Sequence, residues 1–169
     1  MPRRTMLILA LAALIALVVI IFVATQLTPQ TSNPAFTTAV DFVASAGKGD
    51  DTATLALLDE PMRAYVSANC PDGSPSACVD AFTPPEWGDQ VSAVFRRAAP
   101  DAENVRNWDV EVIAHYQEGT GASGVCSLID VAPDNTGTWR VTGWAGFIHC
   151  GDPASRDMAI NPDTPNRAP

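Results

Sequence analysis

The chain opens with an uninterrupted apolar segment. Residues 6–27 contain no charged side chain and only two polar ones, Thr25 and Gln26. A helix over this segment would be about 33 Å long at roughly 1.5 Å per residue, which matches the ~30 Å hydrocarbon core of a bilayer. The pattern therefore predicts a transmembrane anchor over residues 6–27.

Basic residues flank this segment unevenly. Arg3 and Arg4 precede it, and the next basic residue after it is Lys48. By the positive-inside rule, residues 1–5 are expected in the cytoplasm and the rest of the chain outside it. The sequence thus predicts a single-pass protein of the cell membrane. A cleaved signal peptide is the alternative, although its apolar region would be shorter, about 7–15 residues.

After a polar linker over residues 28–33, the apolar positions follow a helical period. Asn33-Pro34 is typical of a helix start, because Asn caps the helix and Pro fits its first turn. Two shorter helices are expected to begin near Asp50 and Pro61. The capping box Thr83-Pro-Pro-Glu86 predicts a further helix, whose apolar positions are Trp87, Val91, Val94, Phe95 and Ala98.

In the second half of the exported part the period changes to two. Apolar and polar residues alternate in three segments, which predicts three half-buried strands joined by turns. Helices followed by an antiparallel meander indicate an α+β domain over residues 34–150. Residues 151–169 hold four prolines and little apolar material, so we expect a flexible C-terminal tail.

Three stretches of the chain resemble a known superfamily. They are the opening helix Pro34–Ala46, the Gly49-Asp50 and Leu57-Leu58 pairs after it, and the last hairpin over residues 137–144. Together they resemble the NTF2-like superfamily, and within it the small membrane-anchored exported members (DUF4878-like), over residues 34–149. The resemblance implies a cone of helices packed on a bent antiparallel sheet. It implies no single function, because the superfamily includes enzymes, binding proteins and assembly factors.

Alternation places a row of side chains without any carboxylate on the face that the helices cover. The NTF2-like resemblance implies that an enzyme would use a carboxylate or a His–Asp pair there, within about 3 Å of its substrate proton. We therefore expect no isomerase or dehydratase activity. A cavity for a small apolar ligand is the alternative, and its lining would be Trp108, Tyr116, Phe147 and His149. Because the two histidines lie on opposite faces, neither a metal site nor a cofactor is expected.

The opposite face of the expected sheet carries an apolar patch. Alternation places Trp144 on the opposite face from the core positions of its strand, and it shares this outer face with Leu128 and Ile148. An exposed patch around an aromatic side chain is typical of an interface. We predict that Leu128, Trp144 and Ile148 bind a protein partner or a second copy of the chain. Alternatively, the C-terminal tail covers the patch with Met158 and Ile160.

Four cysteines follow the apolar segment, an even number that indicates disulfides in an oxidising compartment. Cys70 and Cys78 enclose a turn-rich stretch, so we expect them to pair. Cys126 and Cys150 would then form the second disulfide, which requires a bend or bulge in the last hairpin. A zinc site of four cysteines is the alternative, but the chain lacks the close C-x-x-C pairs that it needs.

Charge excludes one class of partner. The net charge is −9, and Lys48 is the only lysine. Such an acidic chain is a poor ligand for nucleic acids, because it would repel their phosphates. The sequence therefore predicts a non-enzymatic, membrane-anchored interaction domain outside the cytoplasm, as an accessory or assembly subunit of an envelope or membrane complex. The alternatives are the small-ligand binder and, third, an NTF2-like enzyme.

Overall fold

The computed structural model describes residues 33–102, 104–118 and 125–149, the last four of them by their backbone alone. The predicted anchor, residues 6–27, and the predicted tail, residues 151–169, lie outside this described part. None of the helices that are described has the length and apolar character needed to cross a bilayer.

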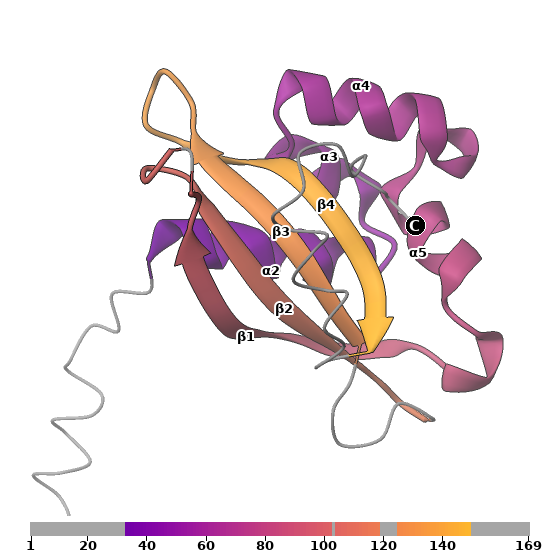
Figure 1. Ribbon diagram of the computed structural model, residues 1–169. Coiled ribbons are helices and arrows are strands. Elements are labelled where there is room, and N and C mark those ends of the chain that lie inside the picture. Colours follow the sequence, from indigo (N-terminus) through magenta and orange to yellow (C-terminus); the bar gives the residue numbers. More distant parts are fainter. Residues whose placement is uncertain (1–32, 103, 119–124, 150–169) are drawn as a thin grey trace, which may run out of the picture. The chain divides into compact units, whose positions relative to one another are not determined.

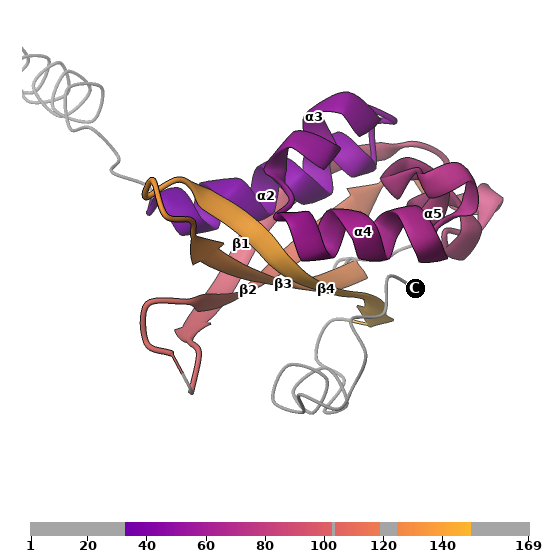
Figure 2. The same ribbon diagram turned by 90° about the horizontal axis from the view of Figure 1, so that it is seen from above.

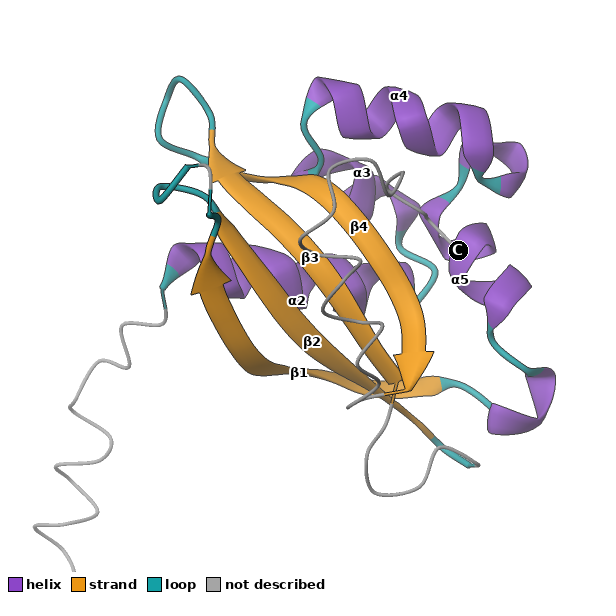
Figure 3. Cartoon of the chain, viewed as in Figure 1, coloured by secondary structure: helices purple, strands orange, loops and turns teal. Residues whose placement is uncertain are grey.

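Helices make up the first half of the described chain (Figure 3). Each begins after a side chain that accepts a hydrogen bond from a backbone N–H of the first turn, which satisfies a donor that the helix itself leaves free. The capping residues are Asn33, Asp50, Asp59 and Ser74. The α-helices are α2 (Pro34–Ala46), α3 (Asp51–Leu57), α4 (Glu60–Asn69) and α5 (Pro75–Phe82).

An antiparallel sheet makes up the second half. Its strands are β1 (Gln90–Pro100), β2 (Trp108–Tyr116), β3 (Val125–Pro133) and β4 (Trp139–His149), and they lie side by side in chain order. The helices cover one face of this sheet, and α2 runs across it in contact with all four strands (Figures 1 and 2). The expected α+β class is confirmed.

The helix predicted after Thr83 is wrong. The segment forms a short 3-10 turn, Pro85–Trp87, and then strand β1. Two β-bulges interrupt β1, one between Gln90 and Ser92 and one between Phe95 and Arg97. Each bulge adds a residue and shifts the strand's alternation, so the apolar residues recur every three or four positions and imitate a helix.

The core lies between α2 and strands β2, β3 and β4. Five positions of α2 are buried, and three of them are alanines, which let the helix backbone approach the sheet closely; the five are Ala35, Ala39, Phe42, Val43 and Ala46. The facing positions of the sheet are fully buried as well, and they are Val110, Val112, Ile129, Val131 and Val141. The helix predicted to begin at Asn33-Pro34 is confirmed as α2. Its Phe36 and Val40 lie at the margin of the core.

The outward position predicted for Trp144 is also wrong. Val131 pairs with Val141 and Asp130 with Gly143, so Thr142 is an extra residue in β4. This bulge reverses the alternation beyond it. Ile129 therefore pairs with Trp144, and the two side chains lie on the helix-covered face. The indole of Trp144 is only 2% exposed and packs edge-on against the ring of Phe42.

The predicted disulfide between Cys70 and Cys78 is confirmed. It joins the residue that ends α4 to the middle of α5, and both cysteines are buried. Cys126 is disulfide-bonded too, while its expected partner Cys150 lies outside the described residues. The backbone of Cys126 pairs with that of Ile148 next to an irregularity in the β3–β4 register, which agrees with the bend that this second pairing requires.

Candidate functional site

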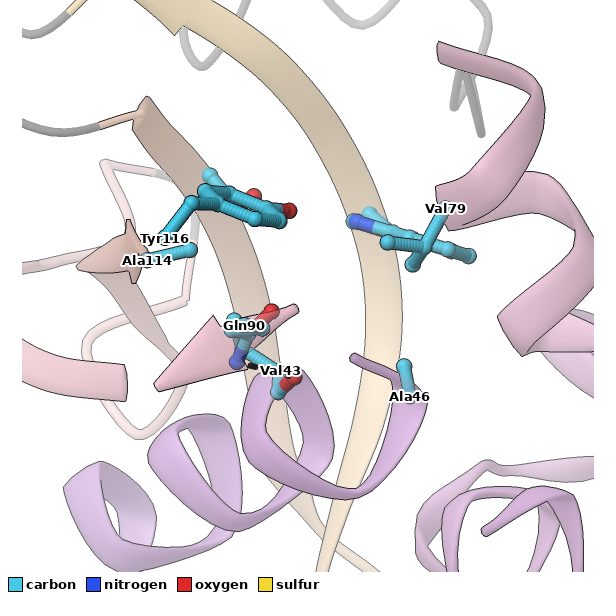
Figure 4. Close-up of a pocket in the computed structure, with 8 residues that line it drawn as sticks. Val43, Ala46, Val79, Gln90, Ala114 and Tyr116 are labelled. Carbon is cyan, nitrogen blue, oxygen red and sulfur yellow. Dashed lines mark hydrogen bonds between the residues drawn. The ribbon is translucent and has the colours of Figure 1, made fainter. Parts of the chain in front are cut away.

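A small cavity lies between α2, α5 and the helix-covered face of the sheet (Figure 4). Its volume is about 10 Å³, which is room for roughly one water molecule. Tyr116 stands on one side of this space and Val79 on the other. The complete lining is Val43, Ala46, Val79, Gln90, Ala114, Tyr116, Ser127 and Trp144.

The polar groups around the cavity serve mainly to hold the fold. Gln90 Nε2 donates a hydrogen bond to the carbonyl oxygen of Val43, which ties the start of β1 to α2. The hydroxyl of Tyr116 lies 3.3 Å from that of Thr83, and burial raises the pKa of the Tyr116 phenol. Trp144 Nε1 is buried without a hydrogen-bond partner among the described residues. No carboxylate or histidine belongs to this lining.

The cavity contains only part of the predicted ligand-binding set. Tyr116 lines it, whereas Trp108 lies at the other end of β2 and packs against Phe36. The side chains of Phe147 and His149 lie outside the described residues. Trp144, which we expected on the outer face, contributes to the lining instead. The bulge at Thr142, which the alternation of residue types does not reveal, accounts for this exchange.

The outer face of the sheet holds an ion-pair cluster that the pattern of the sequence does not predict. Arg96 Nη1 lies 2.6 Å from Glu111 Oε1, and Arg97 Nε binds the other carboxylate oxygen. Consecutive strand residues normally point to opposite faces, but the bulge between Phe95 and Arg97 lets both arginines reach one carboxylate. Glu111 is buried. In the described part of the chain these two arginines share a single acid, so the cluster of three side chains carries one net positive charge.

A second polar feature of the outer face is a pair of aspartates. Asp109 and Asp130 are direct cross-strand partners on β2 and β3. Burial first, and then the nearby charges of Asp109 and Asp101, raise the pKa of Asp130 to about 7. Its Oδ1 atom is buried without a hydrogen-bond partner among the described residues. Within those residues, no group of three or more acidic, histidine or cysteine side chains has the arrangement of a metal site.

The two edges of the sheet are finished differently. Along β4, Leu58 forms a parallel bridge with Val141, and the N–H of Asp59 donates to the Val141 carbonyl oxygen at 3.0 Å. Along β1, no described segment pairs with the outer edge. This strand also exposes large apolar side chains, since Val91 is 54%, Val94 40% and Phe95 44% accessible. We refer to residues 91–97 as the β1 edge.

The predicted interface on the outer face is not assembled as expected. Leu128 is half-buried on that face, next to Ala145 of β4. Trp144 is in the core, and the side chain of Ile148 lies outside the described residues. In the described part of the chain, three of the five large apolar side chains that are exposed lie on the β1 edge instead, in a segment whose spacing had indicated a helix; the other two are Phe82 and Val105.

Comparisons with protein-family models, with curated proteins and with solved structures gave no match. The relationship to the NTF2-like superfamily therefore stays a prediction.

Proposed function

We propose that this chain is a non-enzymatic interaction domain, tethered outside the cytoplasm by a transmembrane helix over residues 6–27, and that it binds a protein partner through the β1 edge. The observation that carries the proposal is the contrast between the two sheet edges. The α3–α4 connection pairs with the β4 edge at Val141, whereas no described segment pairs with the outer edge of β1, where Val91, Val94 and Phe95 are exposed.

An open strand edge is a natural binding surface. It offers a row of backbone N–H and C=O groups that can pair with another extended segment, and soluble proteins usually protect such edges. Exposed apolar side chains on the same strand add the hydrophobic contact that an interface core needs. At about 25 cal/mol per Å², covering these side chains would contribute favourably to association.

The other functions receive less support from the described residues. A binder of small apolar ligands needs a cavity of several hundred Å³, and the cavity beside Tyr116 holds about one water molecule. An NTF2-like enzyme would need an acid or base at that cavity, and its lining consists of apolar, amide and hydroxyl side chains together with the indole of Trp144.

The disulfide supports the proposed location. Cys70–Cys78 is of a kind that persists in oxidising compartments and is rare in the cytosol. This agrees with an exported domain behind an anchor whose Arg3 and Arg4 stay inside. Within this proposal the domain keeps an NTF2-like cone as its scaffold and acts as an accessory or assembly subunit of a membrane or envelope complex.

Site-specific photo-crosslinking in cells tests the proposal. Benzoylphenylalanine is introduced at Val91 or Val94 of the full-length chain, with Thr52 of α3 as the control, because it too is exposed but lies away from β1. We expect one discrete crosslinked protein from the β1 positions and none from Thr52. Absence of a crosslink at both β1 positions, or an equal one at Thr52, would overturn the proposal.

A further inference from the structure

We propose that the β1 edge receives an extended segment of its partner as an additional strand, and that a carboxylate on this segment binds the Arg96–Arg97 pair. The inference rests on the proposed function, because it names the partner chemistry of the same surface. It goes further in specifying main-chain pairing, a short docking length and an acidic residue at one end.

The backbone sets the shape of the occupant. In an antiparallel sheet each strand pairs along two edges, and β1 uses one of them for β2. The two bulges divide β1 into two regular stretches, Ser92–Phe95 and Arg97–Pro100, and only the first lies among the exposed apolar side chains. Bulges disturb pairing on the strand that carries them. The docking length is therefore short, about four residues of the partner.

Apolar side chains line both faces of this stretch. Val94 is paired with Ile113 on the outer face. Phe95 is on the helix-covered face, where its ring stacks on that of Phe36 with centroids 4.8 Å apart. An added strand would place alternate side chains on the two faces, so a partner segment with apolar residues on both sides would cover Val94 and Phe95 together.

Charge defines the remaining feature of the occupant. The side chains of Arg96 and Arg97 are 35% and 49% exposed, and both bind the carboxylate of Glu111. Among the described residues the two guanidinium groups pair with this single carboxylate, which leaves one positive charge uncompensated there and N–H donors available at the end of the docking stretch. Guanidinium groups bind carboxylates through strong charge-assisted hydrogen bonds. An acidic side chain on the partner segment would neutralise this positive charge and accept hydrogen bonds from the guanidinium N–H groups.

A second copy of the chain fits this surface poorly. The segment Gln90–Pro100 has no acidic residue and two arginines, so pairing β1 with another β1 would supply no carboxylate. The occupant is therefore an acidic, apolar segment of a different protein.

Synthetic peptides test the inference directly. The probes are capped peptides of about seven residues, alternating Val and Thr, with one Glu moved through every position and a matched Gln series. Their binding to the full-length chain in detergent micelles is followed by fluorescence anisotropy. We expect at least one Glu peptide to bind about tenfold more tightly than its Gln counterpart, as a charge-assisted contact would produce.

Two variants of the chain assign that preference to the arginines. Arg97→Gln replaces one positive charge with a neutral side chain. We expect the preference of the protein for the Glu peptide over the Gln peptide to fall to about threefold or less. Lys48→Gln removes the same charge from the exposed turn after α2, and the preference should stay near tenfold. Equal effects of the two variants, or no preference for Glu at any position, would overturn the inference.

N-methylated peptides test the main-chain pairing. Alternate amides of an added strand point toward β1 or away from it, so methylating one alternate set should abolish binding while methylating the other leaves it. Loss of binding with both sets, or with neither, contradicts strand addition. A tenfold gain in peptide affinity on deleting residues 151–169 would show that the chain covers its own edge, and would also overturn the inference.

The outcomes separate the two proposals. If the β1 edge crosslinks to a protein but none of the peptides binds, strand addition fails and the interaction function stands. If neither crosslinks nor peptide binding occur, both fail.

Discussion

Trp144 fills the space between α2 and the sheet, where its ring centroid lies 5.0 Å from that of Phe42. Trp144→Ala would leave a cavity that the rigid neighbours cannot close, and we expect a loss of about 3–5 kcal/mol in the free energy of unfolding. Trp139 is only half-buried, so Trp139→Ala should cost less, about 1–2 kcal/mol. Urea unfolding of the full-length chain in micelles compares the two, and a larger loss for Trp139→Ala would contradict the assignment of their faces.

Asp130 gives the fold a dependence on pH. Its pKa is about 7 in the folded protein against an ordinary value of 3.8, so the folded state holds a proton that the unfolded state releases. Stability therefore falls as the pH rises from about 4 to about 7, and stays low above that. We expect Asp130→Asn to remove most of this decline and to stabilise the protein at pH 8 by roughly 1–3 kcal/mol.

Urea unfolding at pH 5 and pH 8 measures this effect. Asp41→Asn is the control, because Asp41 is exposed on α2 and changes the net charge by the same amount. A decline between pH 5 and pH 8 that persists in Asp130→Asn, or vanishes equally in Asp41→Asn, would show that Asp130 is not its source.

At the scale of elements, the disulfide Cys70–Cys78 links α4 to α5 across a short loop. Closing a loop of this length restricts the unfolded chain by about 2–3 kcal/mol. We expect the double variant Cys70→Ser/Cys78→Ser to lose about that much stability under oxidising conditions. The measurement is urea unfolding without reductant, and an unchanged midpoint would show that the helices α4 and α5 need no such link.

The capped helices and the central strands could be predicted from the sequence, because their signals are local. Asn33 and Asp50 cap the helices that follow them, and β2 and β3 alternate regularly. The failures occur at bulges. One extra residue at Thr142 reverses the faces of β4, and two irregularities in β1 conceal its strand period. Such insertions depend on the register with a neighbouring strand, which no local pattern contains.

The candidate site was less predictable than the fold for the same reason. The sequence identified Tyr116 as a cavity residue, but it placed Trp144 on the wrong face. It also gave no indication that Arg96 and Arg97 share Glu111. That contact needs both the bulge in β1 and the pairing of β1 with β2, so it depends on the tertiary structure.

At the scale of the whole molecule, the proposed tether makes a prediction about topology. Arg3 and Arg4 precede the apolar residues 6–27, and no basic residue follows until Lys48. Alkaline phosphatase fused after Pro169 should therefore be active, and a green fluorescent protein fused at the same point and exported unfolded should stay dark. The opposite pattern would place the domain in the cytoplasm and contradict the proposed function.

Because Thr142 is an extra residue in β4, the burial of Trp144 depends on the number of residues in this strand as well as on their types. Thr142 is half-buried, so many side chains would fit there, yet removing the position altogether would turn Trp144 to solvent and bring Ala145 inward. In related sequences we therefore expect the residue type at this position to vary and the number of residues in the strand to stay the same. A one-residue gap at this point of an alignment would mark a protein in which the two faces of the strand have exchanged roles.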